Sequence, residues 1–372
     1  MKRNYVMMAM AAAMLASCAQ TGLVEEIAEE PQKAIDFSTF VDKATRAENS
    51  TADYNWKLED HHTTFNVWGG KELQDGTFHS VYATDAAGTV THNGTNWYAA
   101  PVKYWDKAAK EYYFIAAAPA NANWVAITTT SNDFETGYLK LDNFQLNGTN
   151  LCVKHTNTTV LNNWKGDQDV DLLISNNTKV GRTSYNKATP DDVPLQFSHI
   201  LSRLNIIVCK HSDITADVVM KELVVDKLKS KASFSEATPA DATSPGGSKD
   251  RWSGWDVDYS ITGFTGTTGV GITTNTDAYF IQSLVIPQKI ETENIDINGT
   301  GTINKAYFKI AYTIDGEPYY GYYNLAKAMG KSNFTFDEGW QNTLTITIHP
   351  DGIKFAGSVA EWAEVTDGGE IE

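Results

Sequence analysis

Residues 197–210 read FSHILSRLNIIVCK, and the fold class follows from this stretch. Its second half alternates between two sets of side chains, Leu204, Ile206 and Val208 against Asn205, Ile207 and Cys209. Such alternation places one set on each face of a β-strand. The first half also fits a helical stripe of Phe197, Ile200, Leu201 and Leu204. The β-branched run that follows favours a buried strand, entered through a bulge or short turn, which we expect to be the first core strand of a second β domain.

Strand patterns continue on both sides of this stretch. Dipeptides that tolerate the positive φ of tight hairpin turns separate runs rich in Thr, Val, Ile, Tyr and Phe. These dipeptides are Asn93-Gly94, Asn147-Gly148, Asn298-Gly299, Asp315-Gly316 and Asp351-Gly352. The proline-containing segment TPDDVP at 189–194 interrupts the pattern. The sequence therefore predicts an all-β protein of two tandem antiparallel β-sandwich domains, residues 47–192 and 195–372.

Few segments favour a helix. Residues 217–229 (DVVMKELVVDKLK) fit an amphipathic helix, but four valines leave a strand equally consistent with the pattern. Residues 324–329 (NLAKAM) predict a single helical turn.

Composition excludes some functions. The formal net charge is −16 over 372 residues and no basic cluster occurs, which argues against a nucleic-acid partner. Three cysteines are too few for a disulfide framework. Cys152 and Cys209 lie in apolar strand-like runs, where we expect buried free thiols, with a disulfide between them as the alternative.

The N-terminus has the pattern of an export signal. Lys2 and Arg3 precede an apolar stretch at 6–15, too short to span a bilayer. Leu15-Ala16-Ser17-Cys18 resembles the lipobox of bacterial lipoproteins. We therefore expect residues 1–17 to be a signal peptide, cleavage between Ser17 and Cys18, and acylation of Cys18 with fatty acids such as palmitate. Lipid is the only membrane attachment that the sequence predicts.

Residues 18–46 form a separate segment between the lipidated cysteine and the first domain. Its early part, 19–31, is acidic and has no strand pattern. Ile35, Phe37, Thr39 and Val41 then alternate with Asp36, Ser38, Phe40 and Asp42, as in an isolated strand. A polar stretch follows at 43–53 and contains one arginine, Arg46.

A search for catalytic and metal-binding patterns gives no enzyme signal. HExxH, GxSxG, Walker-type and CxxC motifs do not occur. The remaining groups are a glycine-rich stretch at 263–271 expected to be a flexible loop, a surface pair His61-His62 beside Asp60, an incomplete calcium-loop pattern at Asp167, Asp169 and Asp171, and a buried hydrogen-bonded His199. We expect no catalytic residue, no metal and no cofactor.

Five stretches together resemble the fimbrillin family of lipoprotein pilins, which build type V pili. They are DVDLLIS (169–175), FSHILSRLNIIV (197–208), YFIQSLVIPQ (279–288), FDEGWQNTLTITI (336–348) and VAEWAEV (359–365). The resemblance covers most of the chain. It implies tandem transthyretin-like (Greek-key) sandwiches and export as acylated precursors. It also implies an arginine-specific protease that removes the N-terminal segment, and a groove that a strand from the next subunit fills.

Carried onto this chain, the resemblance makes Ile35, Phe37, Thr39 and Val41 the displaced strand. The bond between Arg46 and Ala47 becomes the cleavage site, because the next arginine, Arg182, lies far inside the first domain. The chain departs from the family after Trp362, where EVTDGGEIE is short for a hydrophobic donor strand. This departure suggests a tip or accessory adhesin, or the donation of another strand from the second domain.

Two functions follow as hypotheses. The first is a structural fimbrial subunit or tip adhesin in the cell-surface fimbrium, held by lipid in the outer membrane before proteolysis-triggered donor-strand exchange. Its partners would be other fimbrial subunits, the protease, and a host or bacterial surface receptor or glycan. The alternative is a surface glycan-binding lipoprotein that does not polymerise, suggested by the aromatic stretches at 96–105 and 251–259.

Overall fold

The computed structural model describes residues 33–41, 58–121, 123–128, 130–146, 171–175, 177–237, 251–274, 279–296, 298 and 301–361. Within these residues strands dominate, and the helices α1 (Leu58–His61), α2 (Arg182–Tyr185) and α3 (Leu325–Ala328) are single turns. The prediction of an all-β fold is confirmed. None of these helices is long or apolar enough to cross a membrane.

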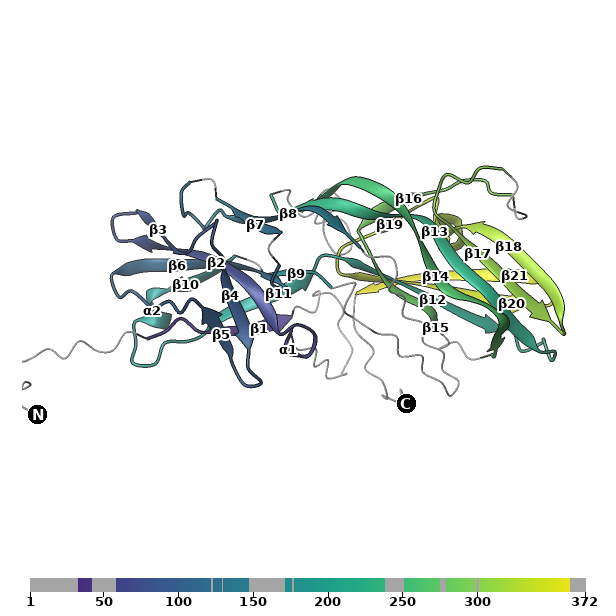
Figure 1. Cartoon of the computed structure of the whole chain (residues 1–372), viewed down its shortest axis with the longest axis horizontal. Coiled ribbons are helices and arrows are strands. Elements are labelled where there is room, and N and C mark those ends of the chain that lie inside the picture. The colour runs from purple at the N-terminus through teal and green to yellow at the C-terminus, as the bar shows by residue number, and fades with distance from the viewer. Residues whose placement is uncertain are drawn as a thin grey trace, which may run out of the picture.

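A nine-stranded sheet builds the part of the molecule drawn on the left of Figure 1. In spatial order its strands are β10 (Thr178–Gly181), β6 (Ala109–Ala118), β9 (Leu173–Ser175), β11 (Val193–His199), β1 (Phe37–Val41), β5 (Trp97–Ala100), β4 (Gly88–His92), β2 (Thr64–Leu73) and β3 (Phe78–Tyr82). Strand β2 also pairs with β6, from Asn66 opposite Ala117 to Leu73 opposite Ala109. This extra pairing makes the sheet return on itself as a ring of seven strands, from which β3 and β10 project.

Two further sheets face each other in the part drawn on the right of Figure 1. One contains β15 (Tyr279–Val285), β12 (Ser202–Lys210), β20 (Trp340–His349) and β21 (Gly352–Glu361). The other contains β18 (Glu317–Asn324), β17 (Tyr307–Ile314), β13 (Val218–Ser235) and β14 (Trp252–Ile272). A separate two-stranded sheet pairs β16 (Gln288–Glu291) with β19 (Asn333–Phe336) in antiparallel fashion.

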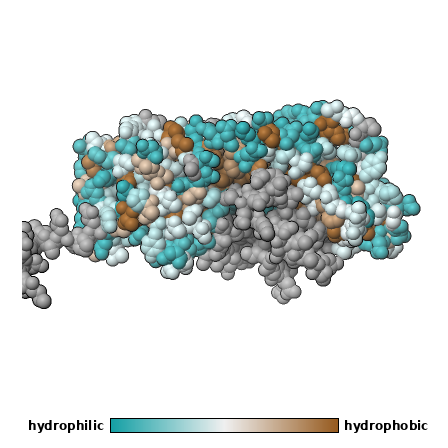
Figure 2. All heavy atoms as spheres, viewed as in Figure 1, coloured by the Kyte–Doolittle hydropathy of each residue, from teal (hydrophilic) through white to brown (hydrophobic). Residues whose placement is uncertain are grey.

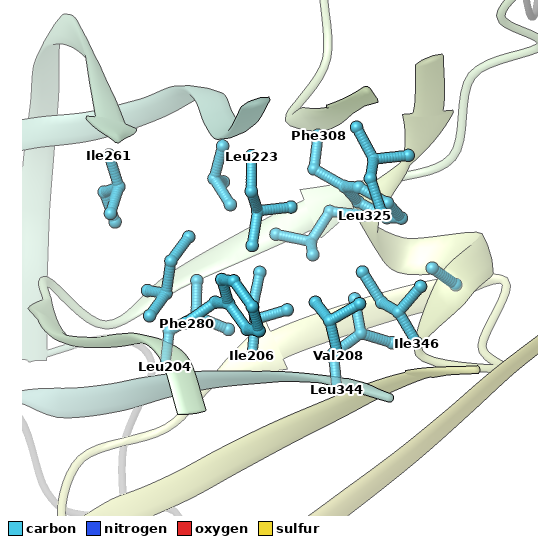
Figure 3. Close-up of a cluster of buried hydrophobic side chains, with 14 of the residues drawn as sticks. Leu204, Ile206, Val208, Leu223, Ile261, Phe280, Phe308, Leu325, Leu344 and Ile346 are labelled. Carbon is cyan, nitrogen blue, oxygen red and sulfur yellow. The ribbon is translucent and has the colours of Figure 1, made fainter. Parts of the chain in front are cut away.

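The core between these two sheets is built of hydrophobic side chains. Figure 3 shows Leu223, Ile261, Phe308 and Leu325 on one side of it, opposite Leu204, Ile206, Phe280 and Leu344 on the other. The alternation read from the sequence produces this contact, because Leu204, Ile206 and Val208 all lie on the inner face of β12. Outside the core, the face drawn in Figure 2 is mainly hydrophilic, with hydrophobic residues in small separate groups.

The stretch at 197–210 divides between the two parts. Residues up to His199 end β11 in the nine-stranded sheet, whereas Ser202–Lys210 form β12 at the centre of the second part. The chain bends at Ile200 and Leu201, both buried. The indole of Trp252 donates to the Ile200 carbonyl oxygen at 3.1 Å, and the Gly339 N–H donates to the Leu201 carbonyl oxygen at 2.8 Å. The predicted core strand is present as β12. The first three residues of the stretch, 197–199, belong instead to the preceding strand, β11.

Strand β13 ties the two parts together. Its first half pairs with β17, and its last residues pair with β8 (Tyr138–Gln145), which in turn pairs with β7 (Trp124–Ile127). Strands from the first half of the sequence therefore join a sheet of the second half. The tandem transthyretin-like arrangement and the boundary at 192–195 stay predictions.

Three local expectations have clear outcomes. Residues 217–229 form part of strand β13, so the strand alternative holds. The glycine-rich stretch at 263–271 is not a loop but part of β14, and a Cβ on Gly263 would lie 2.9 Å from the Phe280 carbonyl oxygen. That close approach explains one glycine within a strand. The helical turn at 324–329 is confirmed as α3, and Asp315 and Gly316 both have positive φ in the turn between β17 and β18.

Candidate functional site: the seat of strand β1

Strand β1 lies inside the nine-stranded sheet. It pairs in parallel with β11 over its whole length, from Phe37 opposite Val193 to Val41 opposite Phe197. On its other side Phe37 lies opposite Trp97 of β5 in an antiparallel pair. Strand β1 is therefore the link between β11 and β5 in the ring of seven strands, and without it the sheet would have two new edges. We call the position of β1 between β11 and β5 the seat.

Backbone hydrogen bonds extend this pairing beyond the strand itself. The Ile35 N–H donates to the Lys103 carbonyl oxygen at 2.8 Å, and the Trp105 N–H donates to the Lys33 carbonyl oxygen at 3.0 Å. On the other side, the Val193 N–H donates to the Asp36 carbonyl oxygen at 2.8 Å. Each bond satisfies a main-chain group that would be costly to bury unpaired.

The side chains of β1 alternate as the sequence predicts. Ile35 and Phe37 are buried, Thr39 and Val41 are half-buried, and Phe40 points outward with 58% of its surface exposed. The inner set belongs to the core of the nine-stranded sheet. Burial weakens toward Val41, so Ile35 and Phe37 supply most of the apolar contact.

The pocket that receives Phe37 is aromatic. Its ring lies edge-on to Phe65 at 6.2 Å and to Phe114 at 5.7 Å between ring centroids, and tilted against Tyr82 at 6.4 Å. Phe65 in turn packs 5.0 Å from Trp97 of β5. The three rings that Phe37 contacts come from β2, β3 and β6, and Phe65 extends the cluster to Trp97 of β5. The sequence pattern showed the inner set of β1 but not these partners, because they are distant in the chain.

Two carboxylates of like charge lie beside each other at the start of the seat. The parallel register that pairs Phe37 with Val193 places the residues before them, Asp36 and Asp192, next to each other. Partial burial and the Asp192 carboxylate both raise the pKa of Asp36 above its ordinary value. Electrostatics therefore oppose the seating of β1 at neutral pH, while its apolar contacts favour it.

Other predicted site residues have mixed outcomes. Ser17, Cys18, Arg46 and Ala47 lie outside the described residues, as do Asp167, Asp169 and Cys152. The side chain of His199 is only 7% exposed and its Nδ1 lies 2.6 Å from an Asp171 carboxylate oxygen, in agreement with the expected hydrogen-bonded core histidine. Cys209 is a buried free thiol, also as expected.

The histidine pair at 61–62 differs from the expectation. His62 is buried rather than on the surface, and its N–H donates to the Leu58 carbonyl oxygen at 2.7 Å across α1. The polar neighbours of His62 in the sequence, Asp60, His61 and Thr63, did not indicate this burial. The described part of the chain contains no group of three or more histidine, cysteine or carboxylate side chains arranged to hold a metal ion.

The aromatic residues considered for glycan binding fall into a buried group and an exposed group. Trp97, Trp105 and Trp252 are core residues. Tyr98, Tyr104 and Trp255 remain exposed to solvent, and the Trp255 indole donates to the Pro287 carbonyl oxygen at 2.9 Å.

Comparisons with known proteins give one family. The sequence model described as fimbrillin-like matches residues 45–362. No curated protein sequence matches the chain. Among solved structures, a fimbrial protein from Bacteroides vulgatus is 15% identical, with a TM-score of 0.46 over 88% of this chain and 99% of that one. A candidate cell adhesion protein from Bacteroides uniformis is 13% identical, with a TM-score of 0.44 over 89% of this chain and 98% of that one.

Proposed function

Because the chain belongs to the fimbrillin-like family, we propose that it is a fimbrial subunit or tip adhesin that assembles by donor-strand exchange at the seat of β1. Family membership supports a fimbrial or adhesin role and implies a location at the cell surface. Export as a lipoprotein acylated on Cys18, and exchange triggered by proteolysis, are the finer parts of the proposal. The position of β1 as the link between β11 and β5 is the observation that carries it.

Loss of β1 would create a strand-shaped vacancy. The departing strand would leave unpaired N–H and C=O groups on β11 and β5, next to the aromatic pocket of Phe37. An extended segment with apolar residues at every second position satisfies the backbone groups and the pocket together. This combination gives a reason for one subunit to bind a strand of another.

A cut after Arg46 would separate both β1 and the lipid anchor from the covalent chain of the two β parts in one step. Residues 42–57 join β1 to α1, so cleavage there leaves β1 held by non-covalent contacts alone. The same cut places Cys18 on the leaving fragment, which separates the body from the lipid. Of the described arginines, Arg203 is buried and Arg251 is largely buried beside Glu338, whereas Arg182 is exposed in α2. Arg182 is therefore the competing site that an experiment has to control.

Strand β21 is the segment of this chain best suited for donation. Among the strands that the structure describes, it is the edge strand of its sheet and pairs with β20 alone. Its inner positions Ile353, Phe355 and Val359 are only partly buried against the core. Ile353 and Phe355 have the two-residue spacing of Ile35 and Phe37, and Val359 lies on the same face four residues later, which matches the requirement of the seat.

The experiment is digestion of the purified precursor with an arginine-specific protease, followed by N-terminal sequencing and size analysis. We expect a new N-terminus at Ala47, loss of the fragment that carries β1, and larger assemblies. The R46Q variant should abolish all three, and the control R182Q should abolish none. Intact precursor after digestion, or assemblies that form equally well with R46Q, would contradict strand exchange at this seat.

A second function, glycan binding without assembly, has one observation in its favour. Trp255 presents part of its indole to solvent while its N–H is fixed on the Pro287 carbonyl oxygen. A fixed, exposed indole face is suited to stacking on a sugar ring. Glycan-array binding by the wild type that disappears in W255A would support it, and the absence of binding by the wild type would remove it.

A further inference from the structure

An exposed apolar strip runs alongside the seat of β1. It consists of Phe40, Tyr98, Val102 and Tyr104, which are 58%, 49%, 54% and 51% exposed. Phe40 belongs to β1, Tyr98 to β5, and the other two to the segment that leads from β5 to β6. We call these four residues the outer strip.

Strand pairing shows that the outer strip follows β1 closely. Phe37 lies opposite Trp97 in an antiparallel pair, so Tyr98, the next residue of β5, projects from the face opposite to that of the buried Phe37. An isolated bridge then pairs Ala34 with Tyr104. Opposed residues project to the same face of a sheet, so Tyr98, Tyr104 and Phe40 all project outward. From Ala34 to Phe40 the strip extends along the seat for roughly 20 Å, at about 3.3 Å per residue.

Packing within the subunit does not account for these side chains. The alternate residues Trp97, Ala99 and Trp105 are buried and supply the contacts of this segment with the core. Outward positions of a sheet are ordinarily polar in a lone subunit, yet here they carry tyrosine and valine. Tyrosine is enriched at protein interfaces, and Lys33, Asp36 and Lys103 around the strip provide a charged rim of the usual kind.

We propose that the outer strip is the surface on which the body of a second copy of this chain packs when its strand occupies the seat. This inference rests on the proposed function, since the strand brings its own subunit to the flank of β11 and β5. Phe40 leaves with β1, and Tyr98, Val102 and Tyr104 remain as the fixed part of the interface. The seat binds an extended strand, and the outer strip adds contacts with the body of the second copy that an isolated strand does not make.

The experiment separates the strip from the seat by using two probes on protease-cleaved precursor. One probe is a labelled peptide of residues 33–41, whose exchange into the seat measures the seat alone. The other is self-assembly of the cleaved protein, measured by light scattering and sedimentation. The test variant is Y98S/Y104S. The matched control is Y319S/Y320S, which removes two tyrosines that are 46% and 58% exposed on β18.

We expect Y98S/Y104S to slow or weaken self-assembly by about tenfold or more while peptide exchange changes less than about threefold. The control should leave both unchanged. Equal assembly by Y98S/Y104S and wild type, or peptide exchange without any self-assembly by the wild type, would overturn this inference and leave the seat intact. Failure of the peptide to exchange would refute the proposed function itself. Binding of a glycan that Y98S/Y104S abolishes, with assembly unchanged, would assign the strip to sugar and also overturn the inference.

Discussion

The rings of Phe37 and Phe114 meet edge to face, with centroids 5.7 Å apart and planes at 89°. Phe37 belongs to a five-residue strand near the N-terminus, and Phe114 lies in the centre of β6, 77 positions later. Edge-to-face geometry is one of the two favoured arrangements of aromatic rings, the other being offset stacking. The contact shows that β1 fills part of the core of the nine-stranded sheet, so a chain that loses β1 must find a replacement or remain destabilised.

The first prediction concerns the stability that Phe37 contributes. Truncation in F37A leaves a cavity among Phe65, Tyr82 and Phe114, and we expect a loss of about 3–5 kcal/mol in the free energy of unfolding of the nine-stranded sheet. Urea unfolding followed by tryptophan fluorescence measures it. The control F40A, on the exposed face of the same strand, should change stability by less than about 0.5 kcal/mol. Similar losses for both variants would contradict the assigned faces of β1.

The second prediction concerns Gln288, whose side-chain amide makes the hydrogen bonds to β13 that a neighbouring strand would otherwise make. Strand β13 leaves β17 after Asp226 and meets β8 at Lys231, and in this gap the Gln288 amide completes the ladder. Its Nε2 donates to the Lys229 carbonyl oxygen at 3.0 Å, and its Oε1 accepts from the Lys229 N–H at 2.9 Å. Q288A leaves both main-chain groups unpaired in a buried position, which costs about 1–3 kcal/mol.

Thermal unfolding of Q288A and Q288E tests this role. A carboxylate at position 288 still accepts from Lys229 N–H but donates nothing, so Q288E should also be destabilised. Wild-type stability in either variant would show that β13 does not depend on this bridge.

The third prediction concerns pH and the buried Glu338. This side chain is 2% exposed between β19 and β20, and an Arg251 nitrogen lies 3.1 Å from one of its oxygens. Burial, with the neighbouring carboxylates of Asp337 and Glu236, outweighs Arg251 and raises the pKa of Glu338 to about 8. A folded-state pKa above the unfolded value of 4.5 means that folding takes up a proton. The stability that protonation of Glu338 contributes is therefore fully present below pH 4.5 and decreases as the pH rises toward 8.

Urea midpoints measured between pH 4.5 and 8.5 test this sign. We expect the midpoint of the C-terminal part to decrease across the range in the wild type, and E338Q, which has no titrating group at this position, to show a flatter profile. An identical slope in both proteins would show that Glu338 does not bind the proton.

The sequence predicted those features of the fold that depend on local pattern. Alternation along 204–208 and 35–41 gave the correct faces of β12 and β1, and the Asp315-Gly316 turn is where the dipeptide placed it. Side-chain period determines which residues are buried, and a hairpin turn is set by its own residues.

The features that the sequence missed depend on distant partners. Nothing in the pattern of β1 indicates that β11 would be its parallel neighbour, or that β8 would join β13 across the predicted boundary. The glycines of β14 suggested a loop, and the reason for one of them, Gly263, lies in another strand, at the Phe280 carbonyl oxygen. Phe40, Tyr98 and Tyr104 became a strip only when pairing brought them to one face.

The most direct test of the central claim is a disulfide that locks β1 in its seat. Ser38 lies opposite Pro194 in the parallel pair, so S38C/P194C places two cysteines on neighbouring strands at a separation that a disulfide can span. After digestion with the arginine-specific protease, the oxidised variant should keep the β1 fragment and fail to assemble, and a reductant should release the fragment and restore assembly. Assembly by the oxidised variant at the rate of the reduced one would contradict the exchange of β1 for a neighbour's strand.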